Sequence, residues 1–257
     1  MFVTTAGRTD DEMIHKAKGI ALSLNVSYID RKKRSIISMQ EIQEDDCLVV
    51  GKERIELYPL GEKQPFFFHP NSSMFRIKRL MDGDHDPFVD ATGMVEGKTL
   101  LDCTLGLASD SIVASCVAGE AGKIVGIEGS QYLSYIVREG LLNWDSGISE
   151  MNEAMRRIQV IPKRSLDYMK ELEDNSFDCV YFDPMFEERI LESDGIIGLS
   201  RFALYEDITD ELIGHALRIA TDRIVLKDHF RSRRFEKFGF QVQRRKTAKF
   251  HFGIIEK

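Results

Sequence analysis

From Lys98 to the end of the chain, short apolar runs alternate with stretches of helical periodicity, and this alternation constrains the fold more than any other feature. Helices are expected at about 109–118, 130–143, 165–173 and 206–221. Near-continuous apolar strands separated by helices form a parallel sheet that is covered on both faces. The five strands predicted for that sheet are Thr99–Cys103, Lys123–Glu128, Arg157–Ile161, Phe177–Asp183 and Asp222–Lys227.

The end of the chain departs from this parallel pattern. Two further strands are predicted at Gly239–Arg245 and Lys249–Glu256, and only a very short turn joins them. Such a pair must be antiparallel, because a parallel crossover needs about a dozen residues or more. An α/β fold whose parallel strands are followed by an antiparallel hairpin resembles the Rossmann-like sheet of class I methyltransferases.

Residues 1–70 predict a separate, small α+β domain, and residues 71–257 form the larger domain. A helix capped by Thr9 or Asp10 is expected to run through 15–22. Short strands are expected at Ser35–Ser38, Cys47–Val50 and Arg54–Tyr58. A basic helix is expected at Met74–Met81, at the start of the larger domain.

The composition predicts a cytosolic protein that needs neither a membrane nor a metal. Hydrophobic residues make up 43% of the chain, yet no run of 18 apolar residues occurs and the N-terminus has no apolar signal segment. The six histidines form no metal-binding pattern. The four cysteines have no paired spacing, which predicts reduced thiols (Cys47, Cys103, Cys116 and Cys179).

Positive charge is concentrated in one segment although the net charge is −7. Between Lys227 and Lys249, nine basic residues accompany only two acidic ones. An acidic protein with one basic face suits a polyanionic partner held at that face. A solvated face neutralised by counterions explains the charge equally well.

The turn after the first strand of the larger domain has the character of a cofactor site. Asp102 ends the strand, Thr104 and Gly106 follow in the turn, and a helix is expected from Ser109. Ligands of open α/β sheets bind at the carboxyl ends of strands, and glycine lets the backbone approach them. The negative charge of Asp102 suits a cationic sulfonium better than a pyrophosphate. An ordinary tight turn is the alternative.

Two later strand ends extend this candidate site. Glu128 ends the second strand, where an acidic residue typically accepts hydrogen bonds from ribose hydroxyls. The third strand leads to Arg164 and Ser165, which could meet an adenine. Capping of the next helix by Ser165 is an equally good explanation of that serine.

The fourth strand ends in the motif that most narrows the chemistry, Asp183-Pro184-Met185-Phe186. The Asp183 carboxylate and the Pro184 carbonyl could each accept one N–H of an exocyclic amine and help localise its lone pair. Phe186 offers a ring on which a base can stack. Lys227, at the end of the fifth strand, is either a phosphate contact or a solvated strand end.

With these motifs the chain resembles the RsmJ-type 16S ribosomal RNA guanine-N2 methyltransferases over most of its length. The resemblance implies S-adenosylmethionine as cofactor and 16S rRNA or the small ribosomal subunit as partner. The matching segments are Arg76–Arg79, Asp102–Asp110, Glu128, Arg164-Ser165, Tyr181–Phe186 and Thr247–Phe252. The residues that would line the cofactor site by this resemblance are Ser109, Asp110, Glu128, Gly129, Arg164, Ser165 and Asp183.

The chain departs from the family pattern at several positions. Ala108 replaces a glycine, and Ser109 and Gly129 replace basic residues. These departures concern the RNA target more than methyl transfer. Two alternatives stay open: the same chemistry on DNA adenine or a protein amide, and a non-catalytic nucleotide- or RNA-binding module. An NAD-dependent dehydrogenase fits less well, because the pyrophosphate-binding glycines are incomplete.

Overall fold

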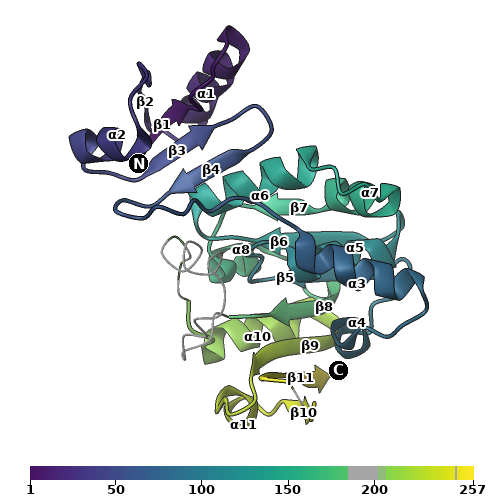
Figure 1. Ribbon diagram of the computed structural model, residues 1–257. Helices are drawn as coiled ribbons and strands as arrows, with labels where there is room; N and C mark the ends of the chain where they lie inside the picture. Colours follow the sequence, from purple (N-terminus) through teal and green to yellow (C-terminus); the bar gives the residue numbers. More distant parts are fainter. Residues whose placement is uncertain (185–201, 203, 205, 247) are drawn as a thin grey trace. The chain divides into compact units, whose positions relative to one another are not determined.

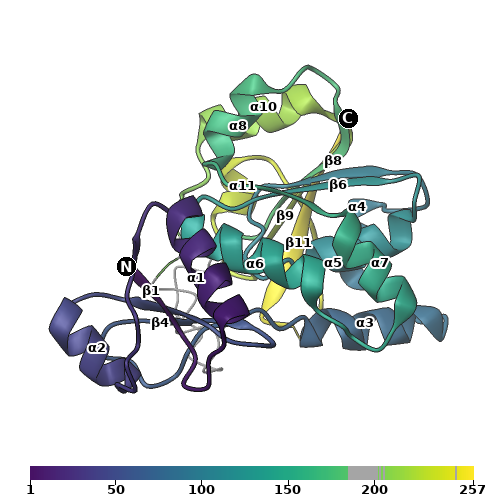
Figure 2. The same cartoon turned by 90° about the horizontal axis from the view of Figure 1, so that it is seen from above.

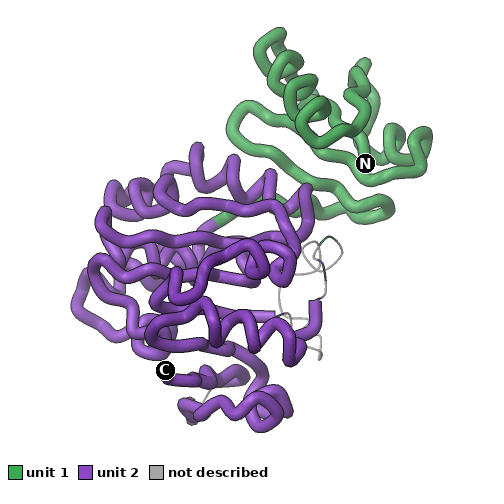
Figure 3. Tube along the Cα trace, turned by 180° about the vertical axis from the view of Figure 1, so that it is seen from behind, with its two compact units in different colours: residues 1–69, 191–203 green, residues 70–190, 204–257 purple. Residues whose placement is uncertain are grey.

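The computed structural model describes residues 1–184, 202, 204, 206–246 and 248–257. These residues form two compact units (Figure 3), one of residues 1–69 and 202, the other of residues 70–184, 204, 206–246 and 248–257. Along the chain, the change from the first unit to the second falls between His69 and Pro70. The described candidates for function all lie in the second unit.

The first unit is a four-stranded sheet with strand order β2-β1-β3-β4. β1 is parallel to both β2 and β3, whereas β4 pairs with β3 in the antiparallel sense. Its elements are β1 (Phe2–Thr5), α1 (Asp11–Ser23), β2 (Ser27–Tyr28), α2 (Ile36–Gln43), β3 (Cys47–Val50) and β4 (Ile55–Tyr58).

The first unit corrects two expectations. The segment Ser35–Ser38, predicted as a strand, begins helix α2 instead. The reason is local, because the Ser35 side chain accepts a hydrogen bond from the Ser38 backbone N–H at 3.1 Å and caps the helix. Strand β1, which was not predicted, lies between two partners in the sheet and is fully buried. The cap of α1 is Asp10, one of the two predicted residues.

The second unit follows the predicted alternation (Figure 1). It begins with α3 (Asn71–Met81), α4 (Pro87–Thr92), β5 (Thr99–Asp102), α5 (Ser109–Ala118), β6 (Lys123–Ile127), α6 (Gln131–Asn143), α7 (Ser149–Arg157) and β7 (Gln159–Ile161). It continues with α8 (Ser165–Glu171), β8 (Phe177–Phe182), α10 (Asp210–Ile219), β9 (Ala220–His229), α11 (Arg234–Lys237), β10 (Gln241–Gln243) and β11 (Phe250–Glu256).

The seven strands of this unit lie in the order β10-β11-β9-β8-β5-β6-β7. Neighbours from β9 to β7 are parallel, and β11 is antiparallel to both β9 and β10. The predicted parallel sheet with a terminal antiparallel hairpin is thereby confirmed. Helix α7 was not predicted, because its sequence is largely polar and buries only Met151, Ala154 and Met155.

Helices cover both faces of this sheet. Seen from above, α8 and α10 lie on one face, and α5, α6 and α7 lie on the other (Figure 2). The central strands are therefore buried on both sides, and Leu100, Leu101, Val180 and Ile224 are inaccessible to solvent. Since every neighbouring pair from β9 to β7 is parallel, the carboxyl ends of these strands meet at one edge of the sheet.

Two further findings concern the described residues. Among them, no helix combines the length and apolar character that crossing a membrane requires. All four cysteines are free, and Cys47, Cys103 and Cys179 are buried as small core side chains.

Candidate active site

Asp102 ends β5 and organises the turn that follows it. Its carboxylate accepts hydrogen bonds from the Thr104 backbone N–H at 3.0 Å and from the Ser111 hydroxyl at 2.7 Å. Gly106 and Ala108 in this turn have φ angles of +49° and +60°. That backbone conformation favours glycine over alanine. The turn therefore keeps the left-handed geometry of a glycine-containing turn even though residue 108 is alanine.

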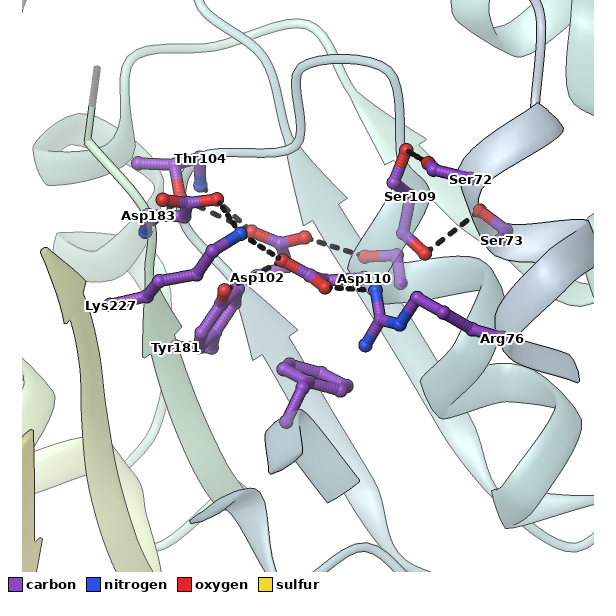
Figure 4. A network of polar contacts seen from close by, with 12 residues as sticks. Ser72, Ser73, Arg76, Asp102, Thr104, Ser109, Asp110, Tyr181, Asp183 and Lys227 are labelled. Atoms are coloured by element: carbon purple, nitrogen blue, oxygen red, sulfur yellow. Dashed lines mark hydrogen bonds and ion pairs between the residues drawn. The ribbon is translucent and has the colours of Figure 1, made fainter. Parts of the chain in front are cut away.

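Asp183 follows β8 and is held from two sides (Figure 4). Its backbone N–H donates to the Thr104 hydroxyl at 2.6 Å, which joins the turn after β8 to the turn after β5. Its carboxylate accepts a hydrogen bond from the Lys227 ammonium, with 2.6 Å between Nζ and Oδ2. The Asp183 side chain nevertheless remains 26% exposed. A carboxylate that is held in one orientation and remains accessible can accept a hydrogen bond from an N–H or O–H group of a substrate.

Asp110, in the first turn of α5, is the centre of a buried polar network. Its Oδ1 atom accepts from Arg76 Nη1 at 2.5 Å, and its Oδ2 atom accepts from Lys227 at 3.1 Å and from the Tyr181 hydroxyl at 2.7 Å. Arg76 also makes a two-pronged ion pair with Asp86 at 2.7 and 2.8 Å. The charges along this network alternate in sign (Figure 4).

Burial and charge act in opposite directions on these groups. Burial raises the pKa of Asp183 to about 6, although Lys227 opposes the shift. Burial also tends to raise the pKa of Asp110, but the charges of Lys227 and Arg76 outweigh it and hold that pKa far below its usual range. The two carboxylates raise the pKa of Lys227 above its usual range against the effect of burial. At neutral pH a single ammonium therefore lies between two carboxylates.

Glu128 follows β6 and faces the Gly106 turn. Its carboxylate accepts the Ser130 backbone N–H at 2.9 Å. Burial raises its pKa to about 6, and hydrogen bonds from the Ser130 and Gly106 backbone lower it. Because a carboxylate offers about four lone-pair positions, Glu128 can accept further hydroxyl groups. At Gly129, a Cβ would lie 2.9 Å from a Leu204 side-chain carbon, so the packing leaves little room for a side chain.

Ser109 connects the start of α5 to α3. Its hydroxyl lies 2.9 Å from the Ser72 hydroxyl, and its carbonyl accepts the Ser73 hydroxyl at 3.0 Å (Figure 4). In this structure Ser109 therefore fixes a helix junction.

Arg164 and Ser165 lie where β7 leads into α8. The Arg164 side chain forms an ion pair with Glu206. The Ser165 hydroxyl donates to the Cys103 carbonyl at 2.5 Å, which ties this turn to the one after β5. Ser165 does not cap α8, because the cap position is Arg164 and carries no side-chain hydrogen bond. The capping explanation of Ser165 was therefore wrong.

Lys227 differs from both sequence-based interpretations. It is neither a solvated strand end nor directed to a phosphate, because its side chain is only 17% exposed and its ammonium binds two carboxylates. Sequence reasoning also did not single out Tyr181 or the ion pairs of Arg76. The register of the sheet explains the contact with Lys227: Phe182 of β8 pairs with Leu226 of β9, so Asp183, which follows β8, lies next to Lys227 within β9.

A group of acidic side chains lies at the carboxyl ends of the strands. Asp102, Glu128 and Asp183 bring three carboxylates to one edge of the sheet, and burial raises the pKa of Asp102 to about 7. Among the described residues, no three His, Cys, Asp or Glu side chains are grouped to hold a metal ion. Pro184 directly follows Asp183, whereas Phe186 lies outside the described residues.

Comparison with known families agrees with this geometry. The family model SAM_MT, described as "Putative SAM-dependent methyltransferase", matches residues 31–251, which is most of the chain. SAM here is S-adenosylmethionine. The match includes Asp102, Asp110, Glu128, Asp183 and Lys227.

Individual relatives support the match at different levels. "Uncharacterized protein YpiP" of Bacillus subtilis is 48% identical and aligns over 99% of this chain and 98% of its own length. "Ribosomal RNA small subunit methyltransferase J" of Francisella tularensis is 35% identical, over 35% of this chain and 36% of its own length. The crystal structure of the SAM-dependent methyltransferase NGO1261 from Neisseria gonorrhoeae has a TM-score of 0.64 and 14% identity, covering 100% of this chain and 96% of its own. At that identity the likeness concerns the fold alone.

Proposed function

The chain belongs to the family of SAM-dependent methyltransferases, and on this basis we propose that it methylates an exocyclic amino nitrogen of a nucleic-acid base. The base is guanine, at N2, in small-subunit ribosomal RNA. The observation that carries the proposal is the Asp183 carboxylate, which is fixed by Thr104 and Lys227 and remains partly exposed. The partial similarity to a ribosomal RNA methyltransferase supports the choice of substrate. A ribosomal substrate implies action in the cytoplasm.

The proposed mechanism uses Asp183 and Pro184 as paired acceptors. S-adenosylmethionine is the cofactor of the family and, when bound, supplies an electrophilic methyl group on a positively charged sulfur. The exocyclic amine donates one N–H to the Asp183 carboxylate and the other to the Pro184 carbonyl. This arrangement holds the nitrogen lone pair toward the methyl carbon, and such alignment is a major source of rate enhancement.

Asp183 also receives the proton that the reaction releases. As the N–C bond forms and the C–S bond breaks, the nitrogen becomes cationic and one of its N–H protons passes to the carboxylate. A base works best when its pKa lies near the working pH. Burial raises the pKa of Asp183 to about 6, closer to neutrality than that of an exposed aspartate, which suits this role.

Glu128 is the proposed acceptor of the cofactor's ribose hydroxyls. Glu128→Ala should weaken S-adenosylmethionine binding by about tenfold or more, because removing a hydrogen bond from a buried site costs about 1–3 kcal/mol. Isothermal titration calorimetry measures this change. Glu120→Ala, the same substitution at an exposed glutamate, is the matched control. An affinity unchanged by Glu128→Ala would remove this residue from the cofactor site.

The terminal hairpin supports RNA as the partner. Arg244 and Lys246 are exposed near its turn. Beside them is a hollow of about 500 Å³, on whose wall Phe230 is 45% exposed and could stack with a base. The residues that line the hollow are Phe230, Ser232, Phe235, Glu236, Phe240, Val242, Arg244 and His251.

Replacing Arg244, Arg245 and Lys246 by glutamine should weaken binding of 16S rRNA. The slope of log K against log salt should fall by about 0.7–0.9 for each phosphate that the protein no longer neutralises. Filter binding over a series of KCl concentrations measures the slope, and cofactor affinity should not change. The control replaces Lys32, Lys33 and Arg34, an exposed basic cluster of the first unit. If the slope falls only in this control, the RNA-binding surface lies on the first unit and not on the hairpin.

The function itself is tested in cells. We expect ribosomal RNA from a strain that lacks this gene to lose one N2-methylguanosine from 16S rRNA, and the intact gene to restore it. Nucleoside mass spectrometry with fragment mapping detects both changes. A loss of N6-methyladenine from DNA, or of a methylated amide from protein, would overturn the RNA assignment but keep the chemistry. No change in any methylated nitrogen would favour a non-catalytic binding module.

A further inference from the structure

Five charged side chains form a row that ends at the proposed acceptor. The row runs Asp86, Arg76, Asp110, Lys227, Asp183, and each neighbour pair is joined by an ion pair. The five side chains come from the cap of α4, from α3 and α5, from β9, and from the turn after β8. Figure 4 shows Lys227 reaching from β9 to the two carboxylates.

We propose that Lys227 is a positioning residue, which holds the Asp183 carboxylate ionised and in a fixed orientation and is itself held by Asp110. The inference rests on the proposed role of Asp183 as acceptor. It gives Lys227 a task within the site in place of a phosphate contact.

The contacts of the Lys227 ammonium hold it in one position. Its ammonium lies 2.6 Å from Asp183 Oδ2 and 3.1 Å from Asp110 Oδ2. It also lies 5.0 Å from the centre of the Phe250 ring, within range of a cation–π contact. Asp110 in turn cannot turn away, because Arg76 and Tyr181 bind it as well. The ammonium is therefore fixed from three directions.

Without Lys227, two carboxylates would face each other in a buried site. Like charges at close range disfavour ionisation, and an opposite charge within hydrogen-bonding distance lowers a carboxyl pKa by about 1–3. Asp183 would then be protonated near neutral pH, so it would accept an N–H more weakly and could not take up the proton that the reaction releases. The other described groups that act on this pair are Arg76, Asp102, Tyr181 and Asp228, and Asp86 acts on Arg76.

The test measures the titration of Asp183 directly, so that it does not depend on the substrate. Carbon-13 NMR of protein labelled at aspartate carboxyls follows each group with pH, and the spectrum of Asp183→Asn assigns the Asp183 signal. Lys227→Met keeps a side chain of similar length without the charge, and should raise the pKa of Asp183 by about 1–3. Asp110→Asn removes the opposing carboxylate, and should lower the pKa of Asp183. Opposite shifts from two adjacent substitutions are not expected of general loosening.

Lys227→Arg retains the charge and should leave the pKa of Asp183 close to that of the parent protein. Lys16→Met, the same substitution at an exposed lysine, should leave it unchanged. If the pKa of Asp183 in Lys227→Met equals that in the parent protein, and the amide spectrum shows an intact fold, the proposal is overturned. If Lys227→Met unfolds the protein, the direction of the shift in Asp110→Asn decides, and an upward shift or none would overturn the proposal.

Methylation assays separate this inference from the proposed function. If the protein methylates RNA, the pH at which the rate of Lys227→Met is half-maximal should rise together with the NMR value, and activity should recover in alkaline buffer. A rate lowered equally at all pH values would contradict the positioning role. If the NMR shifts occur and no RNA, DNA or protein is methylated, the proposed function fails while the ion-pair role of Lys227 stands.

Discussion

Asp183→Ala is expected to reduce the rate of methyl transfer by about 10²-fold or more, because alignment and lone-pair localisation act mainly in the transition state. Asp183→Asn should cause a similar loss, although it preserves the size of the side chain. The amide has no charge and presents N–H donors where the amine needs an acceptor. RNA affinity should fall little in either variant, since phosphate contacts supply most of it.

Single-turnover methylation of 16S rRNA or small ribosomal subunits with labelled S-adenosylmethionine measures this rate. The matched control is Asp82→Asn, the same change at an exposed aspartate of the same unit. Circular dichroism and calorimetry verify that fold and cofactor binding survive in each variant. A rate for Asp183→Ala near that of the parent protein would rule out the paired-acceptor mechanism, whatever the substrate is.

The sheet could be predicted from the sequence because its strands are buried on both faces. Such strands have near-continuous apolar sequences, as at Cys179–Phe182, and their length distinguishes them from helices. The terminal hairpin could also be predicted from the sequence, since a short connection between two strands permits only antiparallel pairing. Elements with a narrower apolar face carried less signal. Helix α7 buries too few side chains to produce a clear periodic pattern, and the adjacent Ile36 and Ile37 of α2 resemble the start of a strand.

The location of the candidate site could be predicted from the sequence, but most of its side-chain contacts could not. Strand ends in a parallel sheet must share one edge, so Asp102, Glu128 and Asp183 could be grouped from sequence alone. The partners of these side chains depend on strand register and on side-chain direction. Neither is encoded by apolar periodicity. Lys227 therefore read as a surface lysine, although its register position places it beside Asp183.

The polar segment before β5 illustrates the same limit. The sequence predicts a basic helix at Met74–Met81, and the family resemblance includes Arg76–Arg79 without giving these residues a role in the site. In the structure Arg76 of α3 enters the network and pairs with Asp86, which also caps α4 by accepting the backbone N–H groups of Phe88 and Val89. Ion pairs between a helix and a loop have no periodic signature in sequence, so only the structure shows them.

Arg76→Met is expected to destabilise the second unit by about 3–5 kcal/mol, because removing one partner of a buried ion pair leaves an uncompensated charge. Arg76 is 23% exposed, and its partners Asp86 and Asp110 are 8% and 10% exposed. Urea denaturation followed by the fluorescence of Trp144, the only tryptophan and a residue of this unit, measures the change.

Arg79→Met provides a control on the same helix. Arg79 pairs with Asp84 at 3.0 Å, but both side chains are more than half exposed, and exposed pairs contribute only about 0–1 kcal/mol. Arg76→Met combined with Asp86→Asn should recover much of the stability. Asparagine removes the unpaired charge and still caps α4.

The destabilisation caused by Arg76→Met should also depend on pH with a defined sign. Burial tends to raise the pKa of Asp86, but the hydrogen bonds and charge of Arg76 outweigh it and hold that pKa below its usual value. A carboxyl whose pKa is lowered by folding stabilises the protein above its unfolded pKa of about 3.9, and this contribution disappears as the pH falls through the folded value. The difference between the parent protein and Arg76→Met should therefore be largest near pH 7 and shrink in acid. A difference that stays constant between these conditions would mean that Arg76 stabilises the unit through its contact with the Phe88 ring and not through its ion pairs with carboxylates.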